Sequence, residues 1–200
     1  DTPEENAKDD YLACMKKVYD YATYITINIS SPNTPGLRGH QSKDSLLKIL
    51  RSLDHKSDDV DLYVKVSPEL DLDIIPEVLE TLNRYKLTGL IATNTTVMKD
   101  RGAGGISGDL LFPKASSMRQ RCLKELQKYP ELELIGVGGF SSFEQIKDFW
   151  KQGGGAVQIY SAFIFQGPDI LKDIHSRLLC DMRKVGVSNF EEYLLKIRQN

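Results

Sequence analysis

Residues 132–160, LELIGVGGFSSFEQIKDFWKQGGGAVQIY, contain the pattern that decides the fold of this chain. The apolar and β-branched residues of Leu132–Val137 predict a strand, and the periodic apolar residues of Phe143–Gln152 predict a helix. A second strand pattern, Ala156–Tyr160, follows. Because strand, helix and strand in this order form a right-handed crossover, the segment predicts two neighbouring parallel strands.

The same alternation extends over the rest of the chain. Earlier strand patterns lie at Tyr24–Ile29, Leu62–Val66 and Leu87–Thr93. Helical patterns lie at Asp9–Ala22, Leu46–Leu53, Ile75–Leu82, Ala115–Lys128, Asp169–Lys184 and Phe190–Ile197. Five strands separated by helices predict parallel βαβ units, which either open into a doubly wound sheet or close into a barrel.

Polar and glycine-rich segments follow the C-terminal ends of these strands. They lie at Asn28–Asn33, Lys65–Pro68, Asn94–Thr96, Gly138-Gly139 and Tyr160-Ser161. In a barrel such ends converge on one face, where the site is assembled. We therefore expect an α/β fold of the TIM (β/α)8 type, with residues 1–200 as about five C-terminal βα units of one barrel domain. About three further strands would precede Asp1, since five cannot close an eight-stranded barrel.

The composition narrows the classes of function. Hydrophobic residues make up 40% and charged residues 27% of the chain, which is ordinary for a globular domain. The net charge of −2, with both signs scattered, gives no basic stripe, so we expect no nucleic-acid partner. No apolar run approaches the roughly 20 residues that span a bilayer. The three cysteines and three histidines lack metal-ligand spacing, so we expect no metal.

Two asparagine-rich segments suit a small planar substrate. Residues 28–38, NISSPNTPGLR, offer two carboxamides and two serine hydroxyls beside prolines, and residues 93–96, TNTT, add another carboxamide. Carboxamides both donate and accept hydrogen bonds, as a ligand rich in carbonyl and N–H groups requires. These residue types also form ordinary turns, so the residues alone leave a structural role open.

Lys65, two glycine-containing segments and Tyr160-Ser161 suit a cofactor. Alternation places Lys65 on the face of Tyr63, and in a barrel interior its charge would need an anion or acceptor, whereas a solvated lysine is the alternative. Residues 102–108, GAGGISG, expose backbone to a flat ligand or simply turn the chain. Gly138-Gly139 and Tyr160-Ser161 follow the last two strands, where barrels bind phosphate. Because no G-x-G-x-x-G turn opens a helix, FMN fits better than NAD.

Five motifs in this order resemble the dihydroorotate dehydrogenases. They are NISSPNTPGLR at 28–38, ATNTT at 92–96, GGISG at 104–108, IGVGG at 135–139 and VQIYS at 157–161. The resemblance spans almost the whole chain, from residue 8 onward. Class 1 members use a cysteine as the catalytic base and class 2 members a serine. Ser31 stands at that place, so the chain resembles class 2.

The resemblance implies an FMN enzyme that oxidises (S)-dihydroorotate to orotate in pyrimidine biosynthesis, an oxidoreductase acting on CH–CH groups. Ser31 would remove the C5 proton, with Thr34 as a relay, while a hydride passes from C6 to FMN, and residues 35–39 would form a lid. Substrate contacts are implied for Asn28, Asn33, Asn94 and Thr95. Cofactor contacts are implied for Asn28, Lys65, Thr93, Ser107, Gly108, Gly138, Gly139, Tyr160 and Ser161.

The class 2 resemblance also implies a membrane quinone as electron acceptor, reached through an N-terminal helical domain, beside the remaining N-terminal part of the barrel. The protein would then be peripheral on a bacterial inner membrane, at its cytoplasmic side, or on a mitochondrial inner membrane. Alternatives are a class 1 enzyme, another FMN barrel such as a dihydropyrimidine dehydrogenase domain, a phosphate-binding barrel of amino-acid biosynthesis, and a non-catalytic barrel fragment. Ser31, in place of cysteine, argues against the first two.

Overall fold

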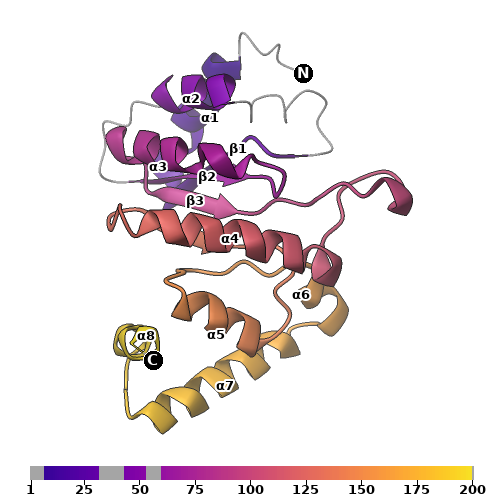
Figure 1. Cartoon of the computed structure of the whole chain (residues 1–200), viewed down its shortest axis with the longest axis vertical. Coiled ribbons are helices and arrows are strands. Elements are labelled where there is room, and N and C mark those ends of the chain that lie inside the picture. The colour runs from indigo at the N-terminus through magenta and orange to yellow at the C-terminus, as the bar shows by residue number, and fades with distance from the viewer. Residues whose placement is uncertain (1–6, 32–42, 53–59, 200) are drawn as a thin grey trace.

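A single parallel sheet organises the chain (Figure 1). The computed structural model describes residues 7–31, 43–52 and 60–199. Its strands are β1 (Tyr24–Asn28), β2 (Asp61–Val66), β3 (Gly89–Ala92) and β4 (Glu133–Gly136). They pair in sequence order, β1-β2-β3-β4, and every pair is parallel. This order is that of a singly wound, barrel-type sheet, because a doubly wound sheet reverses its strand order at a switch point.

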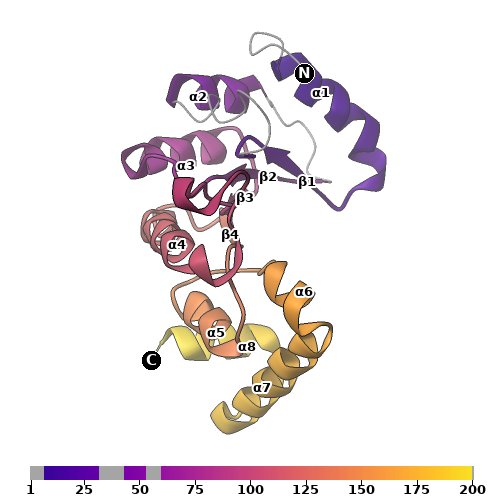
Figure 2. The same cartoon turned by 90° about the vertical axis from the view of Figure 1, so that its right-hand side faces the viewer.

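Helices precede, separate and follow the strands (Figure 1). They are α1 (Ala7–Val18), α2 (Lys43–Ser52), α3 (Ile75–Arg84), α4 (Phe112–Leu126), α5 (Phe143–Lys151), α6 (Ser161–Gln166), α7 (Asp169–Val185) and α8 (Phe190–Arg198). Short 3-10 turns are η2 (Tyr19–Tyr21), η4 (Leu72–Ile74), η5 (Lys99–Arg101) and η6 (Gly108–Leu110). Figure 2 shows α2, α3 and α4 together on one side of the strands.

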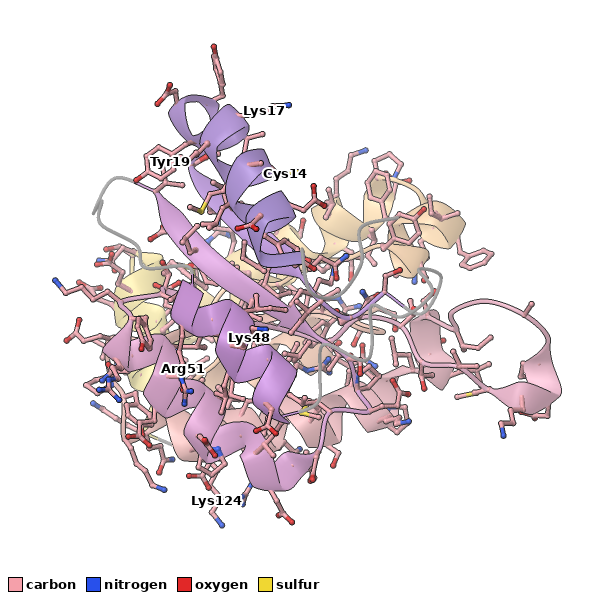
Figure 3. All side chains as sticks on the ribbon, turned by 90° about the horizontal axis from the view of Figure 1, so that it is seen from above. Cys14, Lys17, Tyr19, Lys48, Arg51 and Lys124 are labelled. Atoms are coloured by element: carbon pink, nitrogen blue, oxygen red, sulfur yellow. The ribbon has the colours of Figure 1, made fainter. Side chains whose placement is uncertain are left out.

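These covering helices are amphipathic. Leu46 and Leu50 of α2 are fully buried, whereas Lys48 and Arg51 of the same helix are exposed. Figure 3 labels these two basic side chains, with Lys124 of α4, on the outer surface of their helices. Apolar residues recurring at helical spacing bury one stripe against the sheet and leave the charged stripe in water. This burial is what fixes the helices to the strands.

The two faces of the sheet have different neighbours. Leu62, Val64 and Leu90 belong to the large core between the sheet and the helices. On the opposite side Tyr63, Ile91 and Ile135 form a separate cluster, with Val137 packed against it. Because successive side chains of a strand point to opposite faces, Lys65 shares the side of Tyr63. We call the side that carries Tyr63, Lys65, Ile91 and Ile135 the inner face.

Four of the five predicted strands are confirmed to within about two residues, but Ala156–Tyr160 is wrong as a full strand. That segment makes only an isolated parallel bridge, Gly136↔Val157, with Gly136 N donating to Ala156 O over 2.9 Å and Gln158 N to Gly136 O over 2.8 Å. Val137, the next residue, bonds β3 instead, with its N donating to Ala92 O over 2.7 Å, and no later residue of β4 bonds this segment among the described residues. The segment therefore has a partner for one residue pair alone.

The predicted helices are confirmed with shifted ends, and one helix was missed. Asp9–Ala22 is α1 followed by the turn η2, and the helix predicted from Ala115 begins at Phe112. Pro113 lies in its first turn, where its missing N–H is not needed. The missed helix is α6, which directly follows the segment predicted as the fifth strand. Its N-cap residue, Tyr160, makes no side-chain cap bond, so the sequence carried no start signal.

Truncating a core side chain tests the sheet. Leu90, in the middle of β3, has no exposed surface, so Leu90→Ala should leave a cavity and lower the free energy of unfolding by about 2–5 kcal/mol. Leu195→Ala on α8, where the side chain is 61% exposed, is the matched control and should change it by less than about 0.5 kcal/mol. Urea denaturation of both variants measures the difference, and equal losses would contradict this packing.

Candidate functional site

The C-terminal ends of the strands and the loops after them enclose a cavity of about 930 Å³. This size lies within the range of roughly 300–1,000 Å³ typical of small-molecule and cofactor sites. Ten of the residues singled out in the sequence line it: Lys65, Thr93, Asn94, Thr95, Ser107, Gly108, Gly138, Gly139, Tyr160 and Ser161. They come from five separate segments. The fold therefore brings together most of the candidate residues that it describes.

Asn28 lies next to this cavity through a hydrogen-bonded network. The Nδ2 atom of Asn94 donates to Asn28 Oδ1 over 3.3 Å and to Ser30 Oγ over 3.1 Å. Ser30, which is fully buried, donates from its hydroxyl to Asn28 Oδ1 over 3.1 Å. The loop after β1 is thus tied to the cavity wall. Among the described residues, Asn28 Nδ2 keeps both its hydrogens available for another acceptor.

Ser31 follows this network directly and is half-buried at the end of the described stretch. The structure thus places it beside the Asn28–Ser30–Asn94 network, on the loop after β1. The remaining candidates on that loop, Asn33, Thr34 and the lid 35–39, lie outside the described residues. Their predicted roles stay predictions.

Lys65 occupies the inner face of β2, where the register pairs it with Asn28 on one side and Ile91 on the other. Its ammonium has no hydrogen-bond or ion-pair partner within the described part of the chain, and burial lowers its pKa from the ordinary value. Further down the same face the hydroxyl of Tyr63 donates to Glu133 Oε2 over 2.7 Å, and burial together with this bond raises the pKa of Tyr63. A half-buried cation without a partner favours an anionic or electron-rich ligand.

Two loops close one side of the cavity. The hydroxyls of Ser107 and Ser161 lie 2.7 Å apart and join the loop before α4 to the start of α6. Gly108 has φ +67°, and a Cβ there would lie 3.5 Å from Ser161 Cβ, an ordinary contact. The positive φ, rather than crowding, therefore requires glycine at this position.

The Gly138-Gly139 loop is pressed against the helical side. Both residues have positive φ, +106° and +81°, and a Cβ on Gly138 would come within 2.8 Å of Ala115 Cβ. A Cβ on Gly139 would come within 2.6 Å of Gly108 O. Glycine is thus needed for close packing as well as for backbone conformation. No acceptor among the described residues bonds the N–H groups of these two glycines, which line the cavity.

Sequence reasoning missed two polar clusters, one of which lines the cavity. Lys114 Nζ lies 2.7 Å from Glu69 Oε1, and the Thr96 hydroxyl donates to the same oxygen. Ser141 Oγ donates to Asp109 Oδ1 over 3.2 Å, and both of these residues line the cavity. Members of each cluster are far apart in sequence, so no spacing could reveal them. Within the described ranges, no group of three or more His, Cys, Asp or Glu side chains is placed to bind a metal.

No helix within residues 7–31, 43–52 and 60–199 has both the length and the hydropathy that a bilayer span requires.

Comparison with known proteins identifies relatives of this chain. The family model described as dihydroorotate dehydrogenase matches residues 3–182. The chain is 43% identical over 190 residues to the dihydroorotate dehydrogenase (quinone) of Citrobacter koseri, covering 87% of this chain and 56% of the relative. It is 44% identical to the enzyme of the same name from Salmonella paratyphi B, with the same coverage. The chain thus spans 56% of the length of these curated relatives.

Two solved structures from Eimeria tenella are similar in fold. The DHODH in complex with ferulenol gives a TM-score of 0.82 at 26% identity, covering 96% of this chain and 58% of that one. The ligand-free type DHODH gives 0.83 at 27% identity, covering 96% and 60%. These likenesses confirm the predicted fold class, a part of a TIM (β/α)8 barrel.

Removing the charge of Lys65 tests its placement. Since burial lowers the folded-state pKa below the unfolded value of 10.5, the charged amine opposes folding at neutral pH. Lys65→Met should therefore raise the free energy of unfolding of the ligand-free protein, by less than about 1 kcal/mol because the amine is partly solvated. The gain should shrink as the pH rises towards 10.5, where the unfolded lysine also loses its proton.

Urea titrations at neutral and alkaline pH measure this effect. Lys151→Met, on the exposed side of α5, is the control and should leave stability unchanged at both pH values. A clear loss of stability at neutral pH in Lys65→Met would show that the amine has a stabilising partner, contrary to this description of the inner face.

Proposed function

Because the chain belongs to the dihydroorotate dehydrogenase family, we propose that the full-length protein oxidises (S)-dihydroorotate to orotate, with FMN as its cofactor. The observation that carries the proposal is the convergence of five separate segments on one cavity. Each contributes residues of a type that suits a flavin or a pyrimidine. A non-catalytic fragment has no need for a cation and backbone donors that lack partners, as these do among the described residues, around a cavity of this size.

The chemistry of the cavity fits FMN. Lys65 places a positive charge at the cavity, on the inner face of β2. Such a charge suits the edge of a flavin ring, which becomes negatively charged on reduction. Thr93, Ser107 and Gly108 would lie along the ring. Gly138, Gly139, Tyr160 and Ser161 would hold the phosphate through backbone and hydroxyl donors. When bound, FMN supplies a ring that accepts a hydride from C6 of the substrate.

Ser31 would act as the base in this reaction. Its Oγ accepts the C5 proton of dihydroorotate, and with departure of the C6 hydride the C5=C6 double bond of orotate forms. A serine hydroxyl is a weak base, so it needs a proton acceptor behind it, and Thr34 is the residue we assign as relay. The neighbouring Asn28–Ser30–Asn94 network would hold the loop that carries Ser31 against the cavity wall.

Substrate would be oriented by asparagine carboxamides. Asn94 Oδ1 accepts from Thr95 N over 2.8 Å, which fixes the orientation of the Asn94 carboxamide and leaves one oxygen lone pair for a ligand donor. Asn28 Nδ2 would donate to a substrate oxygen. Asn33 and Thr95 complete the set that we propose for the carboxylate and the pyrimidine edges. Such paired donors and acceptors match a ring with alternating carbonyl and N–H groups.

We extend the proposal to a membrane quinone as the final electron acceptor and to peripheral membrane attachment, on a bacterial or a mitochondrial inner membrane. What supports this extension is the name shared by the curated relatives, dihydroorotate dehydrogenase (quinone). Contact with the remaining N-terminal part of the barrel is proposed likewise.

An assay of the purified full-length protein tests the function. We expect a flavin absorbance spectrum and orotate formation when dihydroorotate is supplied with a ubiquinone-type acceptor, and slower formation or none with fumarate or NAD. Fumarate or NAD as the preferred acceptor would support a class 1 enzyme instead. Absence of flavin, or of orotate with every acceptor, would reject the proposed function.

Two adjacent serines separate the base from its support. Ser31→Ala should slow flavin reduction by dihydroorotate about a hundredfold or more, because a general base is lost, while FMN stays bound. Ser30→Ala removes a hydroxyl that bonds Asn28 and Asn94, so it should mainly raise KM for dihydroorotate. Stopped-flow measurement of flavin reduction distinguishes the two effects. A near-normal rate in Ser31→Ala would rule out Ser31 as the base.

A further inference from the structure

Arg119 is a buried cation outside the cavity. It lies on α4, is 2% exposed, and within the described ranges has no carboxylate partner. Its guanidinium lies 4.3 Å from the ring centroid of Phe140, 5.4 Å from that of Phe112 and 5.9 Å from that of Phe149. A buried charge is costly unless acceptors and aromatic faces compensate it. The three phenylalanine rings supply the aromatic part of this compensation.

Two backbone carbonyls supply the acceptors. Arg119 Nη1 donates to Val137 O over 2.7 Å and to Gly138 O over 3.2 Å. Val137 O also accepts from Thr93 N over 2.8 Å, whereas Arg119 is the sole donor to Gly138 O among the described residues. Arg119 thus fixes the orientation of the peptide between Gly138 and Gly139. Burial lowers the pKa of Arg119 to about 10, so the guanidinium is still protonated at neutral pH.

The orientation of these peptides has a consequence for the cavity. The Val137–Gly138 and Gly138–Gly139 peptide bonds are both trans. In a planar trans peptide the N–H points opposite to the C=O. With the carbonyls of Val137 and Gly138 turned towards Arg119, the N–H groups of Gly138 and Gly139 are turned away from it. Val137, Gly138 and Gly139 line the cavity, but Arg119 does not. The loop therefore separates the guanidinium from the space that the N–H donors of Gly138 and Gly139 face, and these donors have no acceptor among the described residues.

We propose that Arg119 is a positioning residue for an anion at this loop, the phosphate of the cofactor assigned above. It holds two carbonyls so that two N–H donors face the phosphate, and its positive charge behind the loop adds to the attraction. This inference rests on the proposed function, because it takes the ligand to be FMN. A purely structural pin between α4 and the loop would give the same packing without any preference for a phosphate.

Comparison of FMN with riboflavin separates these two roles, because riboflavin has the same ring system and no phosphate. In the full-length protein, Arg119→Met should weaken FMN binding about tenfold or more, the loss expected from one charge-assisted hydrogen bond. Riboflavin binding should change by less than about twofold. Arg119→Lys keeps the charge but not both donor directions, so the ratio of FMN to riboflavin affinity should fall by about threefold.

Arg121→Met is the matched control. Arg121 lies on the same helix and forms an ion pair with Glu125 at 3.4 Å, and its loss should leave both affinities unchanged. Flavin fluorescence titration measures the affinities, and circular dichroism verifies the fold. If Arg119→Met does not fold, the affinity ratio in Arg119→Lys decides.

Three outcomes would overturn the assignment. Equal loss of FMN and riboflavin affinity in a folded variant would show that Arg119 only holds α4 and the loop together. An unchanged affinity ratio in both Arg119 variants would reject any role in phosphate binding. A wild-type protein that binds neither flavin would overturn the proposed function together with this inference, whereas normal FMN binding by the wild type confines the failure to Arg119.

Discussion

The register of the parallel strands is the constraint on which the rest of the structure depends. It places Asn28, Lys65, Ile91 and Ile135 in one row across four strands. A slip of one residue in β2 would turn Lys65 towards the helices, into the space that Val64 and Val66 fill, and would turn their apolar side chains to the opposite face. The large core beneath α3 and α4 thus specifies the register, and the register places the cation at the cavity.

Polar contacts between loops keep the rim of the cavity in place. Asn94 connects the loop after β3 to the loop after β1. Glu69, in the loop after β2, bonds Thr96 in the loop after β3 and Lys114 of α4. Ser107 connects the loop before α4 to the start of α6. These bonds join protein atoms and need no ligand. A site whose side chains are held beforehand loses less conformational freedom on binding. Lys65 and the N–H donors of the glycine loop have no partner among the described residues, and we assign them to a ligand.

Much of this arrangement could be predicted from the sequence, because it depends on local pattern. Alternation in β2 was enough to place Lys65 with Tyr63. The prediction of a fifth strand was wrong because the length of a strand depends on its pairing partner, and β4 ends at Gly136. Arg119 was missed because an arginine in an amphipathic helix ordinarily faces water, and only tertiary packing buries it. The cluster of Glu69, Thr96 and Lys114 was missed for the same reason, since nothing in the spacing of its members indicates contact.

The structure implies that these distant segments form one flavin site. The sharpest test is a structure of the full-length protein with FMN bound. We expect the flavin ring beside Lys65 Nζ and the phosphate within hydrogen-bonding distance of the N–H groups of Gly138 and Gly139. A flavin bound away from the inner face, or a phosphate that contacts neither glycine, would contradict it.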